Sequence, residues 1–172
     1  MLSNSVIASW ISILGITLFL VVSSAKAEEI SSSAIEAIEV KPLNELWLNA
    51  GFYSYHFERD KNLDDNDFGL GVEYRYSSVN SVTAGRFHNS DRKISSYAAW
   101  LFQPYRWGHI RLGLLLGVIN GYPKANNGDW FPLALPVASF EYKYVGFNFT
   151  AVPTYQDMLH GSLSLQLKFK IY

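Results

Sequence analysis

The feature that most constrains this chain is an alternation of apolar and polar residues with a period of two, repeated in eight runs after residue 44. This is the period of a β-strand, whose successive side chains point to opposite faces of a sheet. The clearest run is Gly161–Tyr172, where Leu, Phe and Ile alternate with Ser, Gln and Lys. The eight runs are Glu45–Phe57, Asp67–Tyr76, Val79–Phe87, Ser95–Gln103, His109–Ile119, Phe131–Tyr142, Val145–Val152 and Gly161–Tyr172.

The connections between the runs alternate in length, which distinguishes a membrane barrel from a soluble β-sandwich. The short ones are Ser77–Ser78, Pro104–Gly108 and Lys143–Tyr144, and the longer ones are Glu58–Asn66, His88–Ile94, Asn120–Trp130 and Pro153–His160. Short periplasmic turns, longer outer loops and an even number of strands are typical of outer-membrane barrels. We therefore predict an all-β fold, with an eight-stranded antiparallel transmembrane β-barrel formed by residues 45–172.

The composition agrees with this prediction. The chain is 49% hydrophobic, 16% aromatic and only 17% charged, yet after its N-terminal segment no apolar run reaches the ~20 residues that a membrane-spanning helix needs. The net charge of −1 gives a nucleic-acid partner no electrostatic support, and the absence of cysteine excludes disulfides and zinc–thiolate sites. Aromatic residues gather near the ends of the runs, as in membrane-interface girdles: Tyr74, Tyr76, Phe102, Tyr105, Trp107, Trp130 and Phe131.

Residues 1–27 resemble a secretory signal peptide. The apolar core Ile11–Val22 is followed by small residues at Ala25 and Ala27, so we expect the mature chain to begin at Glu28. The segment before the core carries no Lys or Arg, which leaves an uncleaved anchor helix as the alternative. Export and the barrel pattern together predict the outer membrane of a Gram-negative bacterium.

Residues 28–44 form a lead-in to the barrel that the sequence determines poorly. Ser33-x-x-Glu36 resembles a capping box, and Ile30, Ala34 and Ile38 share one helical face. This pattern fits a short amphipathic helix at a membrane surface. A disordered lead-in that ends at Pro42 is the alternative.

The alternation also predicts what faces the lumen. In the periplasmic half the inward residues are charged: Glu73, Arg75, Arg111, Lys168 and Lys170. Towards the outer rim they are small or apolar: Gly69, Gly71, Leu115, Gly117, Ser162 and Ser164. An eight-stranded barrel has room only for side chains or one slim ligand. We therefore expect paired charges to plug one half and an apolar slot, suited to an acyl chain, to occupy the other.

Two residues that can support acyl transfer are predicted at the outer rim. His56 ends the first run and Ser90 follows the third, and both of these runs rise to that rim. Acyl transfer needs a hydroxyl, a base and donors for the oxyanion. Ser90 would supply the hydroxyl, His56 the base, and Asn89 or the loop amides the oxyanion contact. The alternative is a polar turn and a rim histidine near lipid headgroups.

Two segments resemble the lipid A palmitoyltransferase (PagP) family. Leu135-Pro136-Val137-Ala138-Ser139 through Val152-Pro153 is similar in the spacing of both prolines and in the Ala-Ser between strands. Phe87-His88-Asn89-Ser90 resembles that family's Phe-x-Asp-Ser loop, which carries its catalytic serine, and His56 falls where its catalytic histidine would. The likeness extends over most of Leu46–Tyr172 in architecture and is close in sequence over Gly117–Pro153.

The resemblance implies a monomeric enzyme without cofactor or metal that moves an acyl chain from a phospholipid donor to a lipid A (lipopolysaccharide) acceptor. It also has departures, so this chain would be a divergent member. Asn89 replaces the family's loop aspartate. Pro136 and Pro153 keep the pair that flanks one lateral opening, whereas the prolines of the second opening have no counterpart. Ala98, Ala99 and Trp100 stand where that family has an interior glycine that sets acyl length.

Two other functions remain open at this stage. His88-x-Ser90 resembles the His-x-Ser of lipid A 3-O-deacylase (PagL) barrels, although that family carries its pair near the C-terminal strand. The third possibility is a non-enzymatic barrel that binds lipid or supports the outer membrane. No histidine pair with metal-ligand spacing is present, and the acidic residues 60–67 are better suited to a solvated loop than to a calcium site.

Overall fold

The computed structural model describes residues 35–61, 63–155 and 159–172, so the predicted signal peptide lies outside the described residues. Two short 3₁₀ helices, η1 (Arg59–Lys61) and η2 (Asn126–Gly128), lie in loops. The strands are β1 (Glu36–Ala37), β2 (Pro42–His56), β3 (Asn66–Ser77), β4 (Asn80–His88), β5 (Ile94–Trp107), β6 (Ile110–Ile119), β7 (Phe131–Tyr142), β8 (Val145–Val152) and β9 (Ser162–Lys170).

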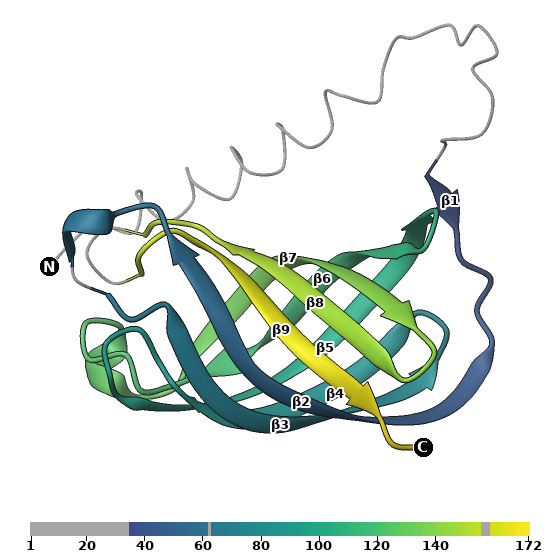
Figure 1. Ribbon diagram of the computed structural model, residues 1–172, viewed down its shortest axis with the longest axis horizontal. Helices are drawn as coiled ribbons and strands as arrows, with labels where there is room; N and C mark the ends of the chain where they lie inside the picture. The colour runs from purple at the N-terminus through teal and green to yellow at the C-terminus, as the bar shows by residue number, and fades with distance from the viewer. Residues whose placement is uncertain (1–34, 62, 156–158) are drawn as a thin grey trace, which may run out of the picture. The chain divides into compact units, whose positions relative to one another are not determined.

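Strands β2 to β9 form a closed antiparallel barrel (Figure 1). Each strand pairs with the next along the chain, and β9 pairs with β2 from Trp47↔Lys170 to His56↔Ser162. All eight predicted runs are confirmed as these strands, although β2 begins earlier, at Pro42, and β5 continues to Trp107, so that most of the predicted turn Pro104–Gly108 belongs to β5. The other bounds differ by two residues at most. Residues 78–79, 108–109 and 143–144 make the connections at one end, here called the turn end. The longer connections, at residues 57–65, 89–93, 120–130 and 153–161, lie at the opposite, loop end.

The helix proposed for the lead-in is wrong where the structure describes it. Residues 36–37 form β1, which pairs with Tyr105 and Arg106 of β5. The physical reason is that β5 is longer than β4. Pairing of these two strands ends at Asn80↔Phe102, but β5 continues to Trp107. The unpaired edge that this overhang leaves is satisfied by an added strand. Ile30, Ser33 and Ala34 lie outside the described residues.

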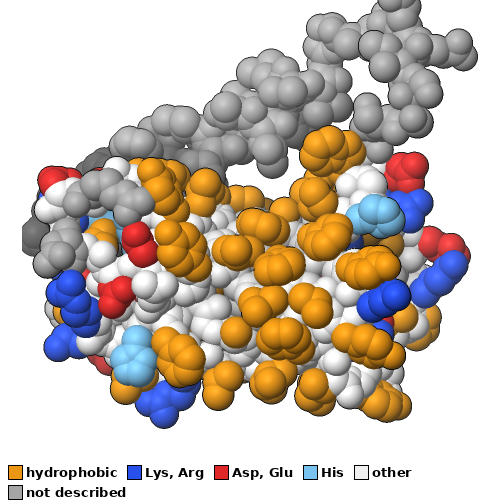
Figure 2. Space-filling model, viewed as in Figure 1, with side chains coloured by type: hydrophobic (Ala, Val, Ile, Leu, Met, Phe, Trp, Pro, Cys, Tyr) orange, Lys and Arg blue, Asp and Glu red, His pale blue; other side chains and the backbone are white. Residues whose placement is uncertain are grey.

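The outer face of the barrel is apolar. Phe68, Leu70 and Val72 of β3 are exposed, Phe68 to 75%. Figure 2 shows apolar side chains gathered across the middle of the visible face, with charged ones towards both ends. Soluble monomers rarely expose so large an apolar patch. No helix among the described residues has the length and hydropathy to cross a membrane. The closed barrel is compatible with an outer-membrane protein.

The lumen at the turn end is filled by ion pairs. The side chains of Lys168 and Glu73 are 0% exposed, and Lys168 Nζ lies 2.9 and 3.1 Å from the two Glu73 carboxylate oxygens. Lys168 Nζ also lies 2.7 Å from Glu141, to which Arg75 and Arg111 donate as well. The prediction of a charged turn-end lumen is confirmed, but Glu45 and Glu141 were not anticipated. We name these residues the ion-pair plug: Glu45, Glu73, Arg75, Arg111, Glu141, Lys168 and Lys170.

Candidate functional site

A β-bulge in β2 turns His56 into the barrel. Trp47 and Asn49 are buried at odd positions, whereas Ser54 and His56 are buried at even positions. The register of β2 shifts against both neighbouring strands around Gly51. An added Cβ at Gly51 would lie 2.2 Å from a β3 carbonyl oxygen, so the bulge requires glycine. Without this extra residue a strict period of two would point His56 outwards.

The His56 ring is held by a carboxylate. Its Nδ1 lies 2.9 Å from Oδ1 of Asp65, and the residue is only 4% exposed. A carboxylate at Nδ1 orients the ring and leaves Nε2 as the nitrogen that can take a proton. The sequence indicated only that an acidic loop was near. The structure identifies Asp65 as the group that can stabilise an imidazolium at this position.

Ser90 lies next to the loop that holds His56. The backbone N–H of Asp64 donates to the Ser90 carbonyl oxygen at 3.1 Å, so residues 57–65 and 89–93 meet at the loop end. Ser90 and Asp91 line the mouth of the lumen cavity. His56 and Ser90 therefore belong to the same rim. No hydrogen bond joins these two side chains in the described part of the chain.

Asn89 holds the turn that carries Ser90, a structural role that the sequence did not predict. It is 1% exposed, and its Nδ2 donates to Ser95 Oγ at 2.9 Å and to the Gly121 carbonyl at 2.8 Å. Its Oδ1 accepts from the N–H groups of Asp91 and Lys93. Both amide hydrogens are engaged, so an oxyanion contact from Asn89 would break the turn that presents Ser90.

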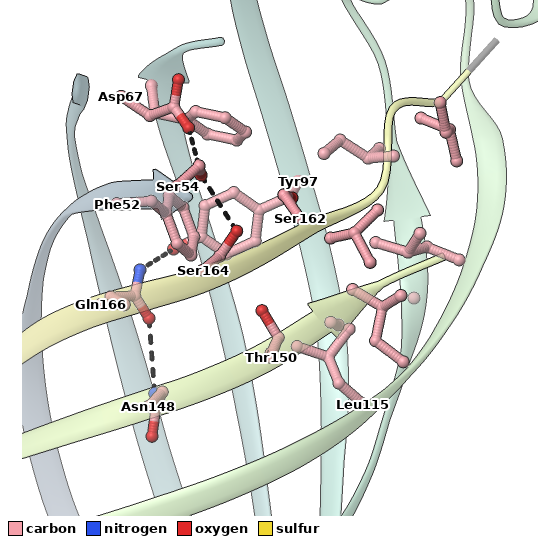
Figure 3. Close-up of a pocket in the computed structure, with 18 of the residues that line it drawn as sticks. Phe52, Ser54, Asp67, Tyr97, Leu115, Asn148, Thr150, Ser162, Ser164 and Gln166 are labelled. Atoms are coloured by element: carbon pink, nitrogen blue, oxygen red, sulfur yellow. Dashed lines mark hydrogen bonds between the residues drawn. The ribbon is translucent and has the colours of Figure 1, made fainter. Parts of the chain in front are cut away.

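A cavity occupies the loop-end half of the lumen. Its volume is about 110 Å³, well above the ~10–15 Å³ that one water requires. Leu115, Leu133 and Leu135 of β6 and β7 form one wall, and polar residues of β2, β8 and β9 form the other (Figure 3). The predicted slot is therefore present, with one apolar wall rather than an apolar lining throughout.

The glycines predicted to open this slot do so only in part. Leu115 and Gly117 line the cavity, but Gly69 and Gly71 do not. A Cβ at Gly71 would lie 2.5 Å from the Tyr97 hydroxyl, because the Tyr97 side chain covers that glycine. A Cβ at Gly117 would lie 2.3 Å from a β5 carbonyl oxygen. Larger side chains at Gly71 and Gly117 would therefore meet neighbouring groups, because these glycines permit close contact with them.

The barrel wall is unpaired beside this cavity. Pairing between β7 and β8 ends at Val137↔Thr150, although β8 continues to Val152. The next residue on β7 is Pro136, which has no N–H to donate, and Pro153 follows β8. A groove on the outside, lined by Pro136 and Phe149, shares Val137 and Thr150 with the lumen cavity. The two predicted prolines thus flank a break in the wall that adjoins the slot.

Tyr122 is a residue at the mouth that the sequence did not indicate. It follows β6 and lines the cavity with Ser90 and Asp91. Burial raises the pKa of its phenol above the ordinary value, and the carboxylates of Asp67 and Asp91 raise it further. The hydroxyl therefore stays protonated and is a potential hydrogen-bond donor at the mouth. Its position depends on a long loop, which periodicity does not describe.

His88, by contrast, is exposed on the outward face of β4, between the inward Phe87 and Asn89.

Among the described residues, no group of three or more His, Cys, Asp or Glu side chains is arranged to hold a metal ion. In comparisons with known proteins, no family model matches the chain and no curated protein matches it.

Proposed function

We propose that this chain is a lipid A acyltransferase of the outer membrane, which moves an acyl chain from a phospholipid to lipid A. The observation that carries the proposal is the lumen cavity. The ion-pair plug fills the lumen at the turn end, Ser90 lies at the mouth, and the unpaired wall at Pro136 adjoins its side. Such a slot suits one slim apolar chain. The resemblance to the lipid A palmitoyltransferase family supports the same activity.

The rim residues supply the chemistry of acyl transfer. The Ser90 hydroxyl attacks the ester carbonyl of the donor and gives its proton to His56 Nε2, and Asp65 stabilises the imidazolium. The Tyr122 hydroxyl donates to the oxyanion. The lysophospholipid leaves with the proton from His56, and a lipid A hydroxyl then takes the acyl chain from Ser90 by the same steps in reverse. The contact between His56 and Ser90 forms when substrate binds, since catalytic hydrogen bonds are often long without it.

Mass spectrometry of lipid A from cells with and without the protein tests this proposal. We expect one added acyl chain with the wild-type protein, and none with Ser90→Ala or His56→Ala. Tyr122→Phe should slow transfer by ~10²-fold, the usual effect of removing one oxyanion donor. His88→Ala is the matched control, because this histidine faces outwards, and it should remain active. An unchanged lipid A mass with folded wild-type protein in the outer membrane would refute the proposal.

The same experiment separates the two alternatives. A deacylase that used His88 and Ser90 would lower the mass of lipid A and would lose activity in His88→Ala. The outward position of His88 gives that arrangement less support. A non-enzymatic lipid-binding barrel would leave lipid A unchanged and would retain bound lipid. Within the described part of the chain, the lack of a hydrogen bond between His56 and Ser90 is the observation that favours this second alternative.

A further inference from the structure

The polar wall of the cavity continues from the rim towards the plug. Ser54 Oγ donates to Asp67 Oδ2 at 2.6 Å and lies 3.0 Å from Ser164 Oγ. Deeper in the lumen, Gln166 Nε2 donates to the Tyr97 hydroxyl at 3.3 Å. Figure 3 shows these groups facing the cavity along one side, opposite Leu115. An unsubstituted alkyl chain would match only the other wall.

Several polar atoms on this wall have no partner within the described residues. Asp67 is 4% exposed, and its Oδ1 is buried without a hydrogen bond. The hydroxyls of Thr150 and Ser162 face the same cavity and make no hydrogen bond within the described chain. A purely apolar occupant that displaced water would leave both of these hydroxyls unsatisfied, which is unfavourable. The wall therefore matches a ligand that carries its own hydrogen-bonding group.

We propose that the slot prefers an acyl chain with a hydroxyl near its carbonyl end, such as a 3-hydroxyacyl chain. This inference rests on the proposed function, because it assumes that the cavity takes an acyl chain. A hydroxyl both donates and accepts, so it can pair with the Thr150 and Ser162 hydroxyls, which themselves donate and accept.

The register of the strands gives the depth of this hydroxyl. His56 pairs with Ser162 at the rim, and one two-residue step deeper Ser54 pairs with Ser164, which pairs with Thr150. That step is ~6.8 Å along the strand. If the ester carbonyl lies beside His56, only the first few carbons of the chain reach this level. The methyl end extends beyond this level, towards the ion-pair plug.

Binding of two methyl esters tests the preference without requiring turnover. The full mature chain is refolded in micelles of a bile salt, a detergent without an alkyl tail that could occupy the slot. It is then loaded with a fluorescent fatty acid. Methyl hexadecanoate or methyl 3-hydroxyhexadecanoate then displaces it. We expect the hydroxy ester to bind ~tenfold more tightly, equivalent to about 1.4 kcal/mol. The double variant Thr150→Val/Ser162→Ala should reduce this ratio to below about twofold, since both hydroxyls that can pair with the ligand are removed. Ser96→Ala, which removes a hydroxyl from the outward face of β5, is the matched control and should keep the ratio.

The outcomes separate the two proposals. Equal affinity of the two esters for the wild-type chain would overturn the hydroxyl preference and leave the acyl slot in place. A preference that survives in the double variant would overturn the assignment to the Thr150 and Ser162 hydroxyls. If neither ester displaces the probe, the cavity is not an acyl site, and the proposed function fails with the inference. The double variant breaks no hydrogen bond, so its barrel should fold as the wild type does.

Discussion

The ion-pair plug predicts that loss of a carboxylate destabilises the barrel more than loss of a cation. Glu73 accepts hydrogen bonds from Lys168, from Ser81 at 2.9 Å and from Asn148 at 3.2 Å. In Glu73→Gln, four cations of the plug would face only two carboxylates, although the side-chain volume is kept. Loss of one partner from a buried pair costs about 3–5 kcal/mol.

Lys168→Met should be milder, although Lys168 is equally buried. Glu73 would keep Arg75 at 3.7 Å and its two neutral donors, and Glu141 would keep Arg75 and Arg111. Three cations would then face three carboxylates. We expect a loss of about 1.5–3 kcal/mol, the value of a hydrogen bond to a charged group. Lys170→Met is the control, because this side chain is 27% exposed and should cost under about 1 kcal/mol.

Equilibrium unfolding by urea in detergent micelles measures these differences. Far-ultraviolet circular dichroism would follow the strands, and tryptophan fluorescence would follow the plug, where the Lys168 Nζ lies 4.8 Å from the Trp47 ring centre. The reasoning is refuted if Lys168→Met costs as much as Glu73→Gln. It is also refuted if neither change exceeds about 1 kcal/mol, because the plug would then be solvated rather than desolvated.

Three further changes test the site and its supports. Asn89→Asp, which restores the residue of the resembling family, should lower activity because a carboxylate cannot donate to the Gly121 carbonyl; increased lipid A acylation in that variant would contradict this role. Gly51→Ala should cost ~1–3 kcal/mol and reduce activity, since the added methyl group crowds the bulge that turns His56 inwards; unchanged thermal unfolding would argue against it. Gly117→Ala should also cost ~1–3 kcal/mol, as its Cβ would lie 2.3 Å from a carbonyl oxygen, and an unchanged stability would show that this position has room for a side chain.

The alternation of residues was sufficient to predict the barrel, because each strand has one apolar outward face and one face in the lumen. On β9 the even positions 162–168 are buried, as the pattern indicated. Periodicity failed where one residue changed the phase, since Gly51 reverses the faces of β2. It also could not predict contacts across the lumen, such as Tyr97 over Gly71, because these depend on barrel closure. The pairing of Asp65 with His56 depends on loop conformation, for which the acidic sequence gave only a general indication.

The plug has an electrical consequence. Its side chains lie in the lumen between the cavity and the turn end, and the described ones pair with one another. Transfer of a free ion past them would require separating charges that already neutralise each other in a dry environment. A bilayer containing this barrel would therefore keep its resistance at any protein density, and single-channel recordings should show a flat baseline.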